Sequence, residues 1–466
     1  MQCNFLVIPA PGITYGYISN SNSTDSLLAK YSITREEFFS MFKLRTVFSA
    51  LAAIVLGLVI GTQIYPQPAV ASGGVCNPTV NNLPVCPSTA PSESASFLDP
   101  TATITNPTNI SLGEKVYVAP FAELNATTAP ITIAEDSNVQ DQVRILASGT
   151  GAEIGPRVIM AHMATIKGAA KIGIQGSTGP FSDPVTNTQF NNTIPETFLS
   201  FNCEIDDATI ERNTVVSFLS RVGPGVTLPA GKVVLPGKNV TTNSQASSGS
   251  LGKVANLTQA DVALMEGIIE VNEAFAKGYT ELARADLSNV QGINYAPVTS
   301  FNTGGLPQIG GSVTRYPNFR NRIIGNIVLQ DSIATLDSKI GNRISLRADE
   351  GQPFNVGEIA GMANDVVFHA LETTSLTLGN GIGYGPRVLV HGGRQVVNGV
   401  ANGPETSVGD DVGLAPNSVI FRSSIGNKSA VGQRSAVFNS TLAPRTAIAS
   451  RTIYANNGNT ISLVEW

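Results

Sequence analysis

A six-residue spacing of aliphatic or small side chains runs through two long stretches of the chain. The second half shows this spacing at Val408, Leu414, Ile420, Ile425, Val431, Val437 and Ala443, with one step of five. The first half shows it at Ile154, Met160, Ile166 and Ile172. The period is typical of a parallel β-helix, in which each triangular coil takes three hexapeptides and aliphatic side chains stack inward. An ordinary β-sandwich would not keep such a step across several turns. We therefore predict a mainly β protein with two tandem left-handed parallel β-helices, built from hexapeptide repeats.

The composition agrees with such a fold and excludes one class of partner. Only 14% of residues are charged and 6% are aromatic, whereas glycine occurs 45 times and proline 27 times. Glycine and proline at this frequency indicate many tight turns and few long helices. The net charge is −5 and no basic run occurs, so the chain lacks the electrostatic footprint of a nucleic-acid-binding protein. We expect no nucleic-acid partner.

One amphipathic helix is expected beyond the first six-residue pattern. Thr258 can cap its start, and Asp261 stands at its third position. Its apolar face is formed by Val262, Met265, Ile268, Ile269 and Phe275. We predict that this helix closes a first domain, residues 100–287. A linker with proline and glycine then spans 288–317, and a second domain without such a helix spans 318–466.

The amino end has the features of an export signal. Residues 41–71 hold two basic residues, an apolar stretch and an Ala-Val-Ala cleavage pattern before Ser72. We interpret residues 1–40 as an extension that precedes the true start of the protein at Met41. Residues 72–99 are interpreted as a leader segment. We expect export to a periplasm, a thylakoid lumen or the outside, with no stable membrane insertion after cleavage. The alternative is an uncleaved anchor, because the apolar stretch is nearly long enough to span a bilayer.

The cysteines do not indicate a metal site. Cys76 and Cys86 lie close together after the cleavage pattern, and Cys203 stands alone. In an oxidising compartment the first two could form a small disulfide loop. None of them has a partner at zinc-finger spacing, so we expect no cysteine-bound metal.

The second domain holds two of the chain's three histidines in a recognisable setting. The stretches ISLRADEGQPFNVG and DVVFHALET resemble a segment of the gamma-class carbonic anhydrases. In that family an arginine and an Asp-Glu-Gly run precede a first zinc histidine, which Ala-Leu-Glu follows. The matching residues here are Arg347, Asp349, Glu350, His369 and Glu372. His391 then falls at the family's third ligand position.

The first domain resembles other parts of the same family. EDSNVQDQVRIL matches the family's Asn-x-Gln-Asp run with Asn138, Gln140 and Asp141. In IGPRVIMAHMATIKG, His162 occupies the middle ligand position. The predicted closing helix aligns Asn272 with an active-site asparagine of the family.

Each domain alone lacks part of the family's site. In the first domain, Leu146 and Lys167 stand at the first and third ligand positions. In the second, Pro386 stands at the middle position, and proline cannot bind zinc. Gly361 and Ala363 replace the family's asparagine and glutamine there. Every ligand missing from one domain is present in the other, so together they hold one complete set.

The resemblance implies a single composite metal site between neighbouring β-helices. His162 would come from the first domain, and His369 and His391 from the second. Zn²⁺ is the expected metal, although Fe²⁺ or Co²⁺ would also suit three imidazoles. The fourth metal position would hold water, which the metal turns into a hydroxide that attacks CO2 and gives bicarbonate. The family also implies a homo-oligomer with trimer-like packing of β-helices.

The resemblance assigns roles to the remaining residues. Gln140, beside Asn138, would orient the hydroxide, and Asn272 would hold CO2 or bicarbonate. Glu372, together with Glu350, would carry the released proton to solvent. In addition, the family implies a pairing across the domain interface that involves Arg347, Asp141 and Asp349.

Two other functions stay open on the sequence. Hexapeptide-repeat acyltransferases share the fold and use a histidine as general base, although no acyl-donor site is marked here. A metal-free scaffold that assembles a larger complex would be favoured if the linker kept His162 away from the other histidines. Asn138 and Gln140 could also be turn residues, and Glu350 and Glu372 solvated charges. Fold alone does not separate these functions.

Overall fold

The structure, a computed structural model, describes residues 75–466. Two predicted segments lie outside the described residues. They are the amino-terminal extension, 1–40, and the signal peptide, 41–71. Cys76 and Cys86 form a disulfide, with their Cα atoms 5.7 Å apart. Among the described residues, no helix combines the length and apolar character that crossing a bilayer would take.

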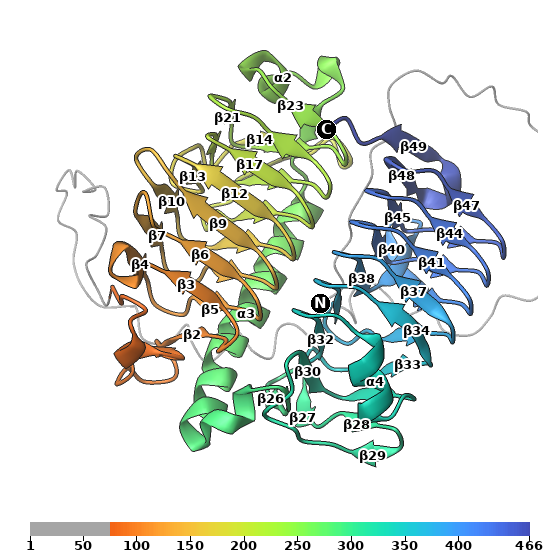
Figure 1. Ribbon diagram of the computed structural model, residues 1–466. Helices are drawn as coiled ribbons and strands as arrows, with labels where there is room; N and C mark the ends of the chain where they lie inside the picture. Colours follow the sequence, from red (N-terminus) through yellow and green to blue (C-terminus); the bar gives the residue numbers. More distant parts are fainter. Residues whose placement is uncertain (1–74) are drawn as a thin grey trace, which may run out of the picture. The chain divides into compact units, whose positions relative to one another are not determined.

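The first β-helix has three sheets, stacked coil upon coil (Figure 1). Its nine-stranded sheet, the first nine-stranded sheet below, is ordered β1 (Val85–Cys86), β2 (Ser96–Leu98), β5 (Tyr117–Val118), β8 (Asn138–Val139), β11 (Val158–Met160), β16 (Thr197–Leu199), β19 (Thr214–Val216), β22 (Lys232–Val234) and β24 (Val254–Asn256). The six-stranded sheet is ordered β21 (Thr227–Leu228), β18 (Thr209–Ile210), β13 (Lys171–Ile172), β10 (Ala152–Ile154), β7 (Ile131–Ile133) and β4 (Ile110–Leu112). The seven-stranded sheet is ordered β23 (Asn239–Val240), β20 (Arg221–Val222), β17 (Glu204–Asp206), β12 (Thr165–Gly168), β9 (Arg144–Ala147), β6 (Glu123–Asn125) and β3 (Thr103–Thr105).

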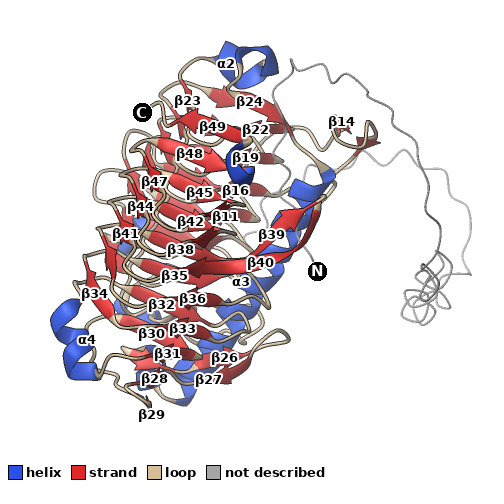
Figure 2. Ribbon diagram, turned by 90° about the vertical axis from the view of Figure 1, so that its right-hand side faces the viewer, coloured by secondary structure: helices blue, strands red, loops and turns tan. Residues whose placement is uncertain are grey.

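The second β-helix also has three sheets (Figure 2). Its nine-stranded sheet, the second nine-stranded sheet below, is ordered β25 (Ile293–Asn294), β30 (Arg322–Gly325), β32 (Ser345–Ala348), β35 (Val367–Ala370), β38 (Leu389–Gly392), β42 (Val419–Phe421), β45 (Ala436–Phe438), β48 (Thr452–Ala455) and β49 (Thr460–Leu463). The next sheet is ordered β29 (Ser312–Val313), β28 (Gln308–Ile309), β31 (Ile327–Leu329), β33 (Phe354–Val356), β36 (Leu376–Leu378), β40 (Val400–Val408), β43 (Ser424–Ile425) and β46 (Thr441–Leu442), and β39 (Arg394–Val397) pairs with β40 as a hairpin. The five-stranded sheet is ordered β34 (Ile359–Met362), β37 (Ile382–Tyr384), β41 (Gly413–Leu414), β44 (Ala430–Val431) and β47 (Ala447–Ile448).

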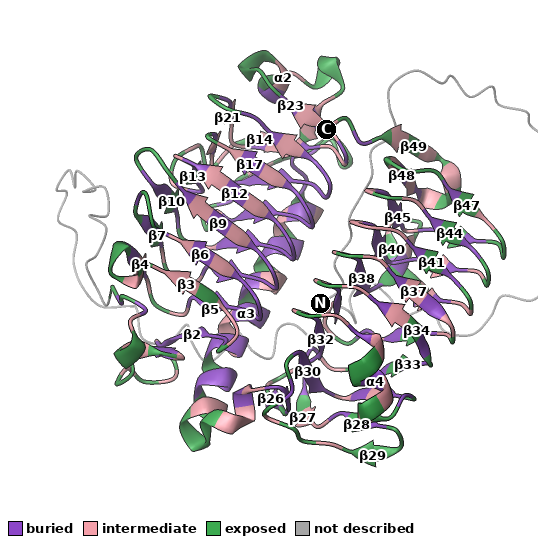
Figure 3. Ribbon diagram, viewed as in Figure 1, coloured by how far each residue is buried: buried purple, intermediate pink, exposed green. Residues whose placement is uncertain are grey.

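The strand pairing confirms the prediction of a mainly β protein with two tandem left-handed parallel β-helices. Within each sheet, a strand pairs in parallel with the strand one coil further along the chain, apart from a few antiparallel pairs at the sheet ends and the β39–β40 hairpin. Two short hairpins lie outside these sheets, β14 (Phe181–Ser182) with β15 (Gln189–Phe190) and β26 (Ala296–Val298) with β27 (Thr303–Gly305). Figure 3 shows exposed turns along the outer edges of both β-helices, whereas turns of the first β-helix such as residues 140–143 and 161–164 are buried.

The predicted core positions point inward, with one exception. Ile154, Met160, Ile166 and Ile172 are all buried in the first β-helix. In the second, Ala443 is exposed and Leu442 takes its place in the core. The corner that follows the second nine-stranded sheet takes a step of five residues in both of the last coils, from Ile420 to Ile425 and from Val437 to Leu442. A strict six-residue step therefore overshoots the core there by one position.

The predicted closing helix is α3 (Gln259–Ala285). Residues 75–466 also hold two shorter helices, α2 (Asn243–Ser247) and α4 (Ile333–Lys339). The backbone N–H of Asp261 donates to Thr258 Oγ1 at 3.1 Å, and the Thr258 N–H donates to Asp261 Oδ2 at 2.9 Å, which is the expected capping box. Met265, Ile269 and Phe275 are buried as predicted. The helix lies along the first nine-stranded sheet and also packs against residues of the second β-helix (Figure 1).

Two of the predicted boundaries differ from the structure. The expected leader, 72–99, already contributes β1 and β2 to the first β-helix. The expected linker, 288–317, holds β25 to β29, and β25 and β28 pair into sheets of the second β-helix. Proline and glycine are frequent in both segments because the strands are short and the turns between them tight, which made the segments resemble linkers.

Candidate metal centre

Successive coils of the first β-helix place four side chains above one another at one corner. These side chains form the first column, Asp141, His162, Phe201 and Phe218. Backbone hydrogen bonds fix this stacking, since Met163 N–H donates to Asp141 O at 2.9 Å, Asn202 N–H to His162 O at 3.1 Å and Leu219 N–H to Phe201 O at 3.0 Å. The residue after each member has left-handed backbone, at Gln142 (φ 59°), Met163 (φ 63°), Asn202 (φ 52°) and Leu219 (φ 54°). This conformation turns the chain at the corner and leaves the preceding side chain pointing outward.

A second column stands opposite, on the second nine-stranded sheet. It consists of Arg347, His369, His391, Phe421 and Phe438. The strand register pairs His369 with His391, His391 with Phe421 and Phe421 with Phe438. The two columns contact each other along their length. Asp141 faces Arg347, the three histidines come next, and the phenylalanines follow. The interface between the β-helices therefore brings the predicted ligands together.

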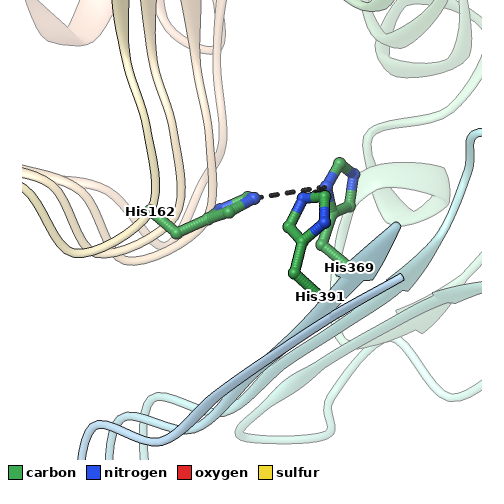
Figure 4. A group of neighbouring side chains, drawn as sticks. All are labelled: His162, His369 and His391. Carbon is green, nitrogen blue, oxygen red and sulfur yellow. Dashed lines mark hydrogen bonds between the residues drawn. The ribbon is translucent and has the colours of Figure 1, made fainter. Parts of the chain in front are cut away.

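The three histidines converge on one point from the two β-helices (Figure 4). His162 Nε2 lies 3.2 Å from His369 Nδ1, which lies 3.4 Å from His391 Nε2. All three side chains are buried. The linker thus does not keep His162 from the other two histidines, which was the condition that would favour a metal-free scaffold.

The second nitrogen of each ring faces an acceptor. His391 Nδ1 lies within hydrogen-bond distance, 2.9 Å, of Gly392 O. His162 Nδ1 lies 3.1 Å from Asp141 Oδ2, and His369 Nε2 lies 3.3 Å from Asp349 Oδ1 and 3.2 Å from Glu350 Oε1. The angles at His162 and His369 fall short of full hydrogen bonds, so these contacts are electrostatic. Each acceptor favours a proton on the nitrogen beside it.

These protonation preferences make the cluster fit a cation. With the outer nitrogens protonated, the three inner nitrogens present only lone pairs to one another. Such an arrangement is unfavourable unless a metal ion or a proton lies among them. Three imidazoles with a free fourth position suit a catalytic zinc site, and the outer acceptors resemble the partners that orient zinc-bound histidines. Among the described residues, these histidines form a group whose ligand atoms lie within 4.8 Å of one another.

Burial also keeps the rings in the form that binds metal. It lowers the pKa of His369 to about 4 and that of His162 below its ordinary value. The pKa of His391 is held well below its ordinary value by burial and then by the neighbouring histidines. Neutral imidazole is the metal ligand, so all three rings are ready to bind at neutral pH.

An ion-pair network lies on one side of the three histidines. Arg347 Nη2 donates to Asp141 Oδ2 at 2.9 Å, and Arg347 Nη1 donates to Asp349 Oδ2 at 2.6 Å. Burial alone would raise the pKa of both carboxyls, but Arg347 lowers that of Asp349 to about 2 and holds that of Asp141 lower still. Tyr279 donates its hydroxyl to Asp349, and Ser345 donates to Asp141. The expected pairing of Arg347 with Asp141 across the interface is therefore present.

Aromatic rings cover the other side of the histidines. Phe201 stacks on His162 with ring centroids 5.7 Å apart, and Phe421 meets His391 edge-on at 5.2 Å. The two phenylalanines contact each other across the interface at 5.5 Å. Neither phenylalanine was predicted from the sequence. An insertion between β13 and β16 separates Phe201 from His162 and hides their stacking. The hairpin β39–β40 likewise separates Phe421 from His391, so the regular spacing of the earlier coils does not reach Phe421.

A cavity of about 320 Å³ opens beside His369 and His391. Gln140, Glu350 and Glu372 all line it, as their predicted roles require. Burial, followed by the charge of Asp349, raises the pKa of Glu350 well above its ordinary value. The raised pKa favours the protonated form of Glu350, whereas Glu372 stands half-buried at the cavity wall.

Two residues predicted for the site do not line this cavity. Asn138 lies on β8 beneath α3 and is completely buried. Asn272 donates its side-chain amide to Ile268 O, one turn earlier in the same helix, at 2.8 Å. The cavity wall at this helix is formed instead by Leu264, Gly267, Ile268 and Val271. The predicted contact of Asn272 with CO2 or bicarbonate therefore has no counterpart in this geometry.

Comparison with known proteins points to one family. No family model matches the chain. A carbonic anhydrase from Methanosarcina thermophila is 27% identical over 216 residues, which cover 41% of this chain and 77% of that protein. The chain resembles the gamma-class carbonic anhydrases. Among solved structures, a putative acetyltransferase from Bacillus cereus is 18% identical with a TM-score of 0.18, covering 40% of this chain and 94% of that chain. A hexapeptide transferase family protein from Anaplasma phagocytophilum is 16% identical with a TM-score of 0.17, covering 40% and 93%.

The gamma-class positions that lack ligands lie away from the histidines. Leu146 and Lys167 stand side by side on β9 and β12, in the seven-stranded sheet. Lys167 donates to Glu204 at 2.8 Å, so it forms a surface ion pair there. Pro386 is exposed in a turn after β37. The substitutions that remove ligands thus fall on other faces, and the interface between the two β-helices keeps a complete set.

Proposed function

We propose that this chain is a carbonic anhydrase that hydrates CO2 reversibly at a metal site shared by its two β-helices. The observation that carries the proposal is the convergence of three neutral imidazoles, one from the first β-helix and two from the second, beside a cavity. His162, His369 and His391 would hold the metal, for which Zn²⁺ is the first candidate and Fe²⁺ or Co²⁺ the others. When bound, the metal would supply a nucleophile derived from water at neutral pH.

The chain's own residues would position the reactants and move the proton. Gln140 lines the cavity beside His369 and His391, where its amide can orient an oxygen atom. Glu350, with its raised pKa, can hold a proton beside the reacting atoms, and Glu372 can pass it on to solvent. Phe201 and Phe421 line the same cavity and shield from water the parts of His162 and His391 that they contact. Arg347 and Asp141 act as positioning residues for His162.

The decisive experiment measures metal content together with the rate of CO2 hydration. Protein from Ser72 onward is purified without chelators and loaded with zinc or with iron. We expect about one metal per chain, with both metal and activity lost in His162→Ala and in His391→Ala. Lys167→Ala is the matched control, because Lys167 stands at a family ligand position away from the histidines, and it should retain both. A metal-free and inactive wild type under all of these conditions would contradict the proposal.

Two further expectations belong to the proposed function. We propose that the chain is exported after cleavage before Ser72, and that it forms a homo-oligomer with trimer-like packing of β-helices. Amino-terminal sequencing of protein from the native source tests the first, since a start at Met41 or further upstream would contradict cleavage before Ser72. Light scattering on the purified protein tests the second, and a monomer at all concentrations would contradict it.

A further inference from the structure

The cavity beside the histidines is much larger than CO2 needs. Its volume is about 320 Å³. CO2 has three heavy atoms and takes the room of one or two water molecules, roughly 30–60 Å³. A cavity of about 300 Å³ lies at the lower end of those that enclose small organic ligands. The space that CO2 leaves unused therefore requires another explanation.

The unused space is bounded by apolar side chains from both β-helices and α3. Those that line it are Ala161, Phe198, Phe201, Leu264, Ile268, Val271, Leu371, Ala401 and Phe421. Gly267 also lines it, from the interior of α3. Glycine inside a helix costs about 1 kcal/mol relative to alanine, so a side chain there would both stabilise the helix and reduce the cavity. Because Gly267 has no side chain, the cavity stays open, and the helix is less stable than it would be with alanine.

The hairpin β39–β40 completes the enclosure. It reaches from the second β-helix toward α3 (Figure 2), and it contributes Arg394 and Ala401 to the lining. Arg394 pairs with Glu405 of the same hairpin at 2.9 Å, which joins its two strands. Ala401 is only 8% exposed, although it lies near the hairpin tip. The hairpin is thus packed over the cavity and does not project freely into solvent.

The other end of the cavity is polar and suits an anionic group. Gln140, His369 and His391 line the cavity. Arg394 and Arg422 also line it, and they offset the two acidic side chains there, Glu350 and Glu372. The guanidinium carbon of Arg422 lies 5.1 Å from the ring centroid of Phe421, which stands next to His391 in the second column. A carboxylate in this cavity could accept a hydrogen bond from the side-chain amide of Gln140 and would be attracted by the positive charge of Arg422.

We propose that this cavity binds a monocarboxylate with a short hydrocarbon tail, with its carboxylate toward Gln140 and Arg422 and its tail against α3 and the hairpin. The tail contacts protein alone, so it contributes to binding whether or not a metal is present. Binding does not depend on turnover of CO2. The proposal can therefore fail while the proposed function holds, and hold while the proposed function fails.

A chain-length series tests the tail. Acetate, butyrate and hexanoate are titrated into the whole protein by calorimetry, with and without bound zinc. Each methylene buried in an apolar cavity should tighten binding about fourfold. The increase should appear in both forms of the protein, because the tail lies away from the histidines. Equal affinity for all three acids would overturn the proposal.

Two variants and one neutral ligand make the test specific. Gly267→Leu fills the cavity from α3 and favours the helix, so the protein should fold while hexanoate loses its advantage and acetate binds as before. Ala263→Leu is the matched control, because Ala263 is exposed on the same helix, and it should keep the full series. Hexanamide should bind more weakly than hexanoate. An unchanged series in Gly267→Leu, or equal binding of hexanamide, would overturn the assignment.

Discussion

Asp141 contacts two partners, Arg347 and His162. Its substitution should therefore affect both the stability of the fold and the affinity for metal. It accepts from Arg347 across the interface at 2.9 Å and faces His162 Nδ1 at 3.1 Å, with no exposed surface. Asp141→Asn would leave the buried guanidinium with less compensation. We expect the free energy of unfolding to fall by about 3–5 kcal/mol. Metal affinity should fall by roughly 10–100-fold, since a partner that orients a ligand is lost.

Urea unfolding and competition with a metal chelator measure these two effects separately. Ser345→Ala is the control, because Ser345 also donates to Asp141 but carries no charge. Its loss should cost about 1 kcal/mol. If Asp141→Asn behaved like Ser345→Ala in both measurements, the ion pair would have no role in holding His162.

The charged residues and the metal ligands of the site were easier to predict from the sequence than the side chains that line the cavity. The histidines, Arg347 and Asp141 were predictable because their chemistry is specific and each stands in a distinctive run of residues. Asn272 was placed in the site by alignment alone, but the register of α3 directs its amide to Ile268 O. Phe201 was missed because its neighbour in space, His162, lies in the preceding coil, beyond an insertion in the chain.

At the scale of elements, the start of α3 carries a titrating group. Burial raises the pKa of Asp261 to about 6, although hydrogen bonds from Thr258 oppose the rise. Between the ordinary carboxyl value and pH 6, the folded protein binds a proton that the unfolded chain does not. Acidification from pH 7 to pH 4 therefore adds stability through this residue, and stability is lost as the pH rises through 6.

Asp261→Asn removes this titration and keeps an acceptor oxygen for the cap. Over the same pH range, the wild type should gain about 2.4 kcal/mol relative to the variant. Chemical denaturation of both proteins at several pH values measures the difference. Other carboxyls titrate in both proteins and cancel from it. A constant difference from pH 4 to pH 7 would show that Asp261 does not titrate in this window.

The corrected register of the last coils gives a second prediction for the elements. Leu442 fills the core, and its neighbour Ala443 is exposed. Leu442→Ala should destabilise the protein by about 2–5 kcal/mol, because it leaves a cavity in the stack. Ala443→Ser should change stability by less than about 0.5 kcal/mol. Thermal unfolding of the two variants distinguishes them, and the reverse order of effects would restore the strict six-residue step.

The repeat was predictable from the sequence because inward side chains must be aliphatic in every coil. Its exact phase was not, because a corner can take five residues without disturbing the next inward position. The ends of each β-helix were also hidden. β1, β2 and β25 are short strands between prolines and glycines, so they carry too few aliphatic residues to establish a period.

At the scale of the whole molecule, complementation between variants tests whether one chain holds the whole site. His162→Ala and His391→Ala are each purified, unfolded, mixed in equal amounts and refolded together. A site built within one chain predicts that the mixture stays inactive and binds no metal at the site. A site built between chains predicts recovery of about a quarter of the wild-type value, because a quarter of the random pairings are intact.

The covalent connection between α3 and β25 has a consequence for behaviour on dilution. If the metal ligands belonged to separate chains, lowering the protein concentration would eventually dissociate the chains and separate the ligands. Here Ala285 and Ile293 end and begin elements that belong to opposite sides of the cluster, and only a few residues join them. Such a tether holds its two ends at a high effective concentration, which does not change with the amount of protein. The three histidines should therefore stay together even in dilute solution, where separate chains seldom meet.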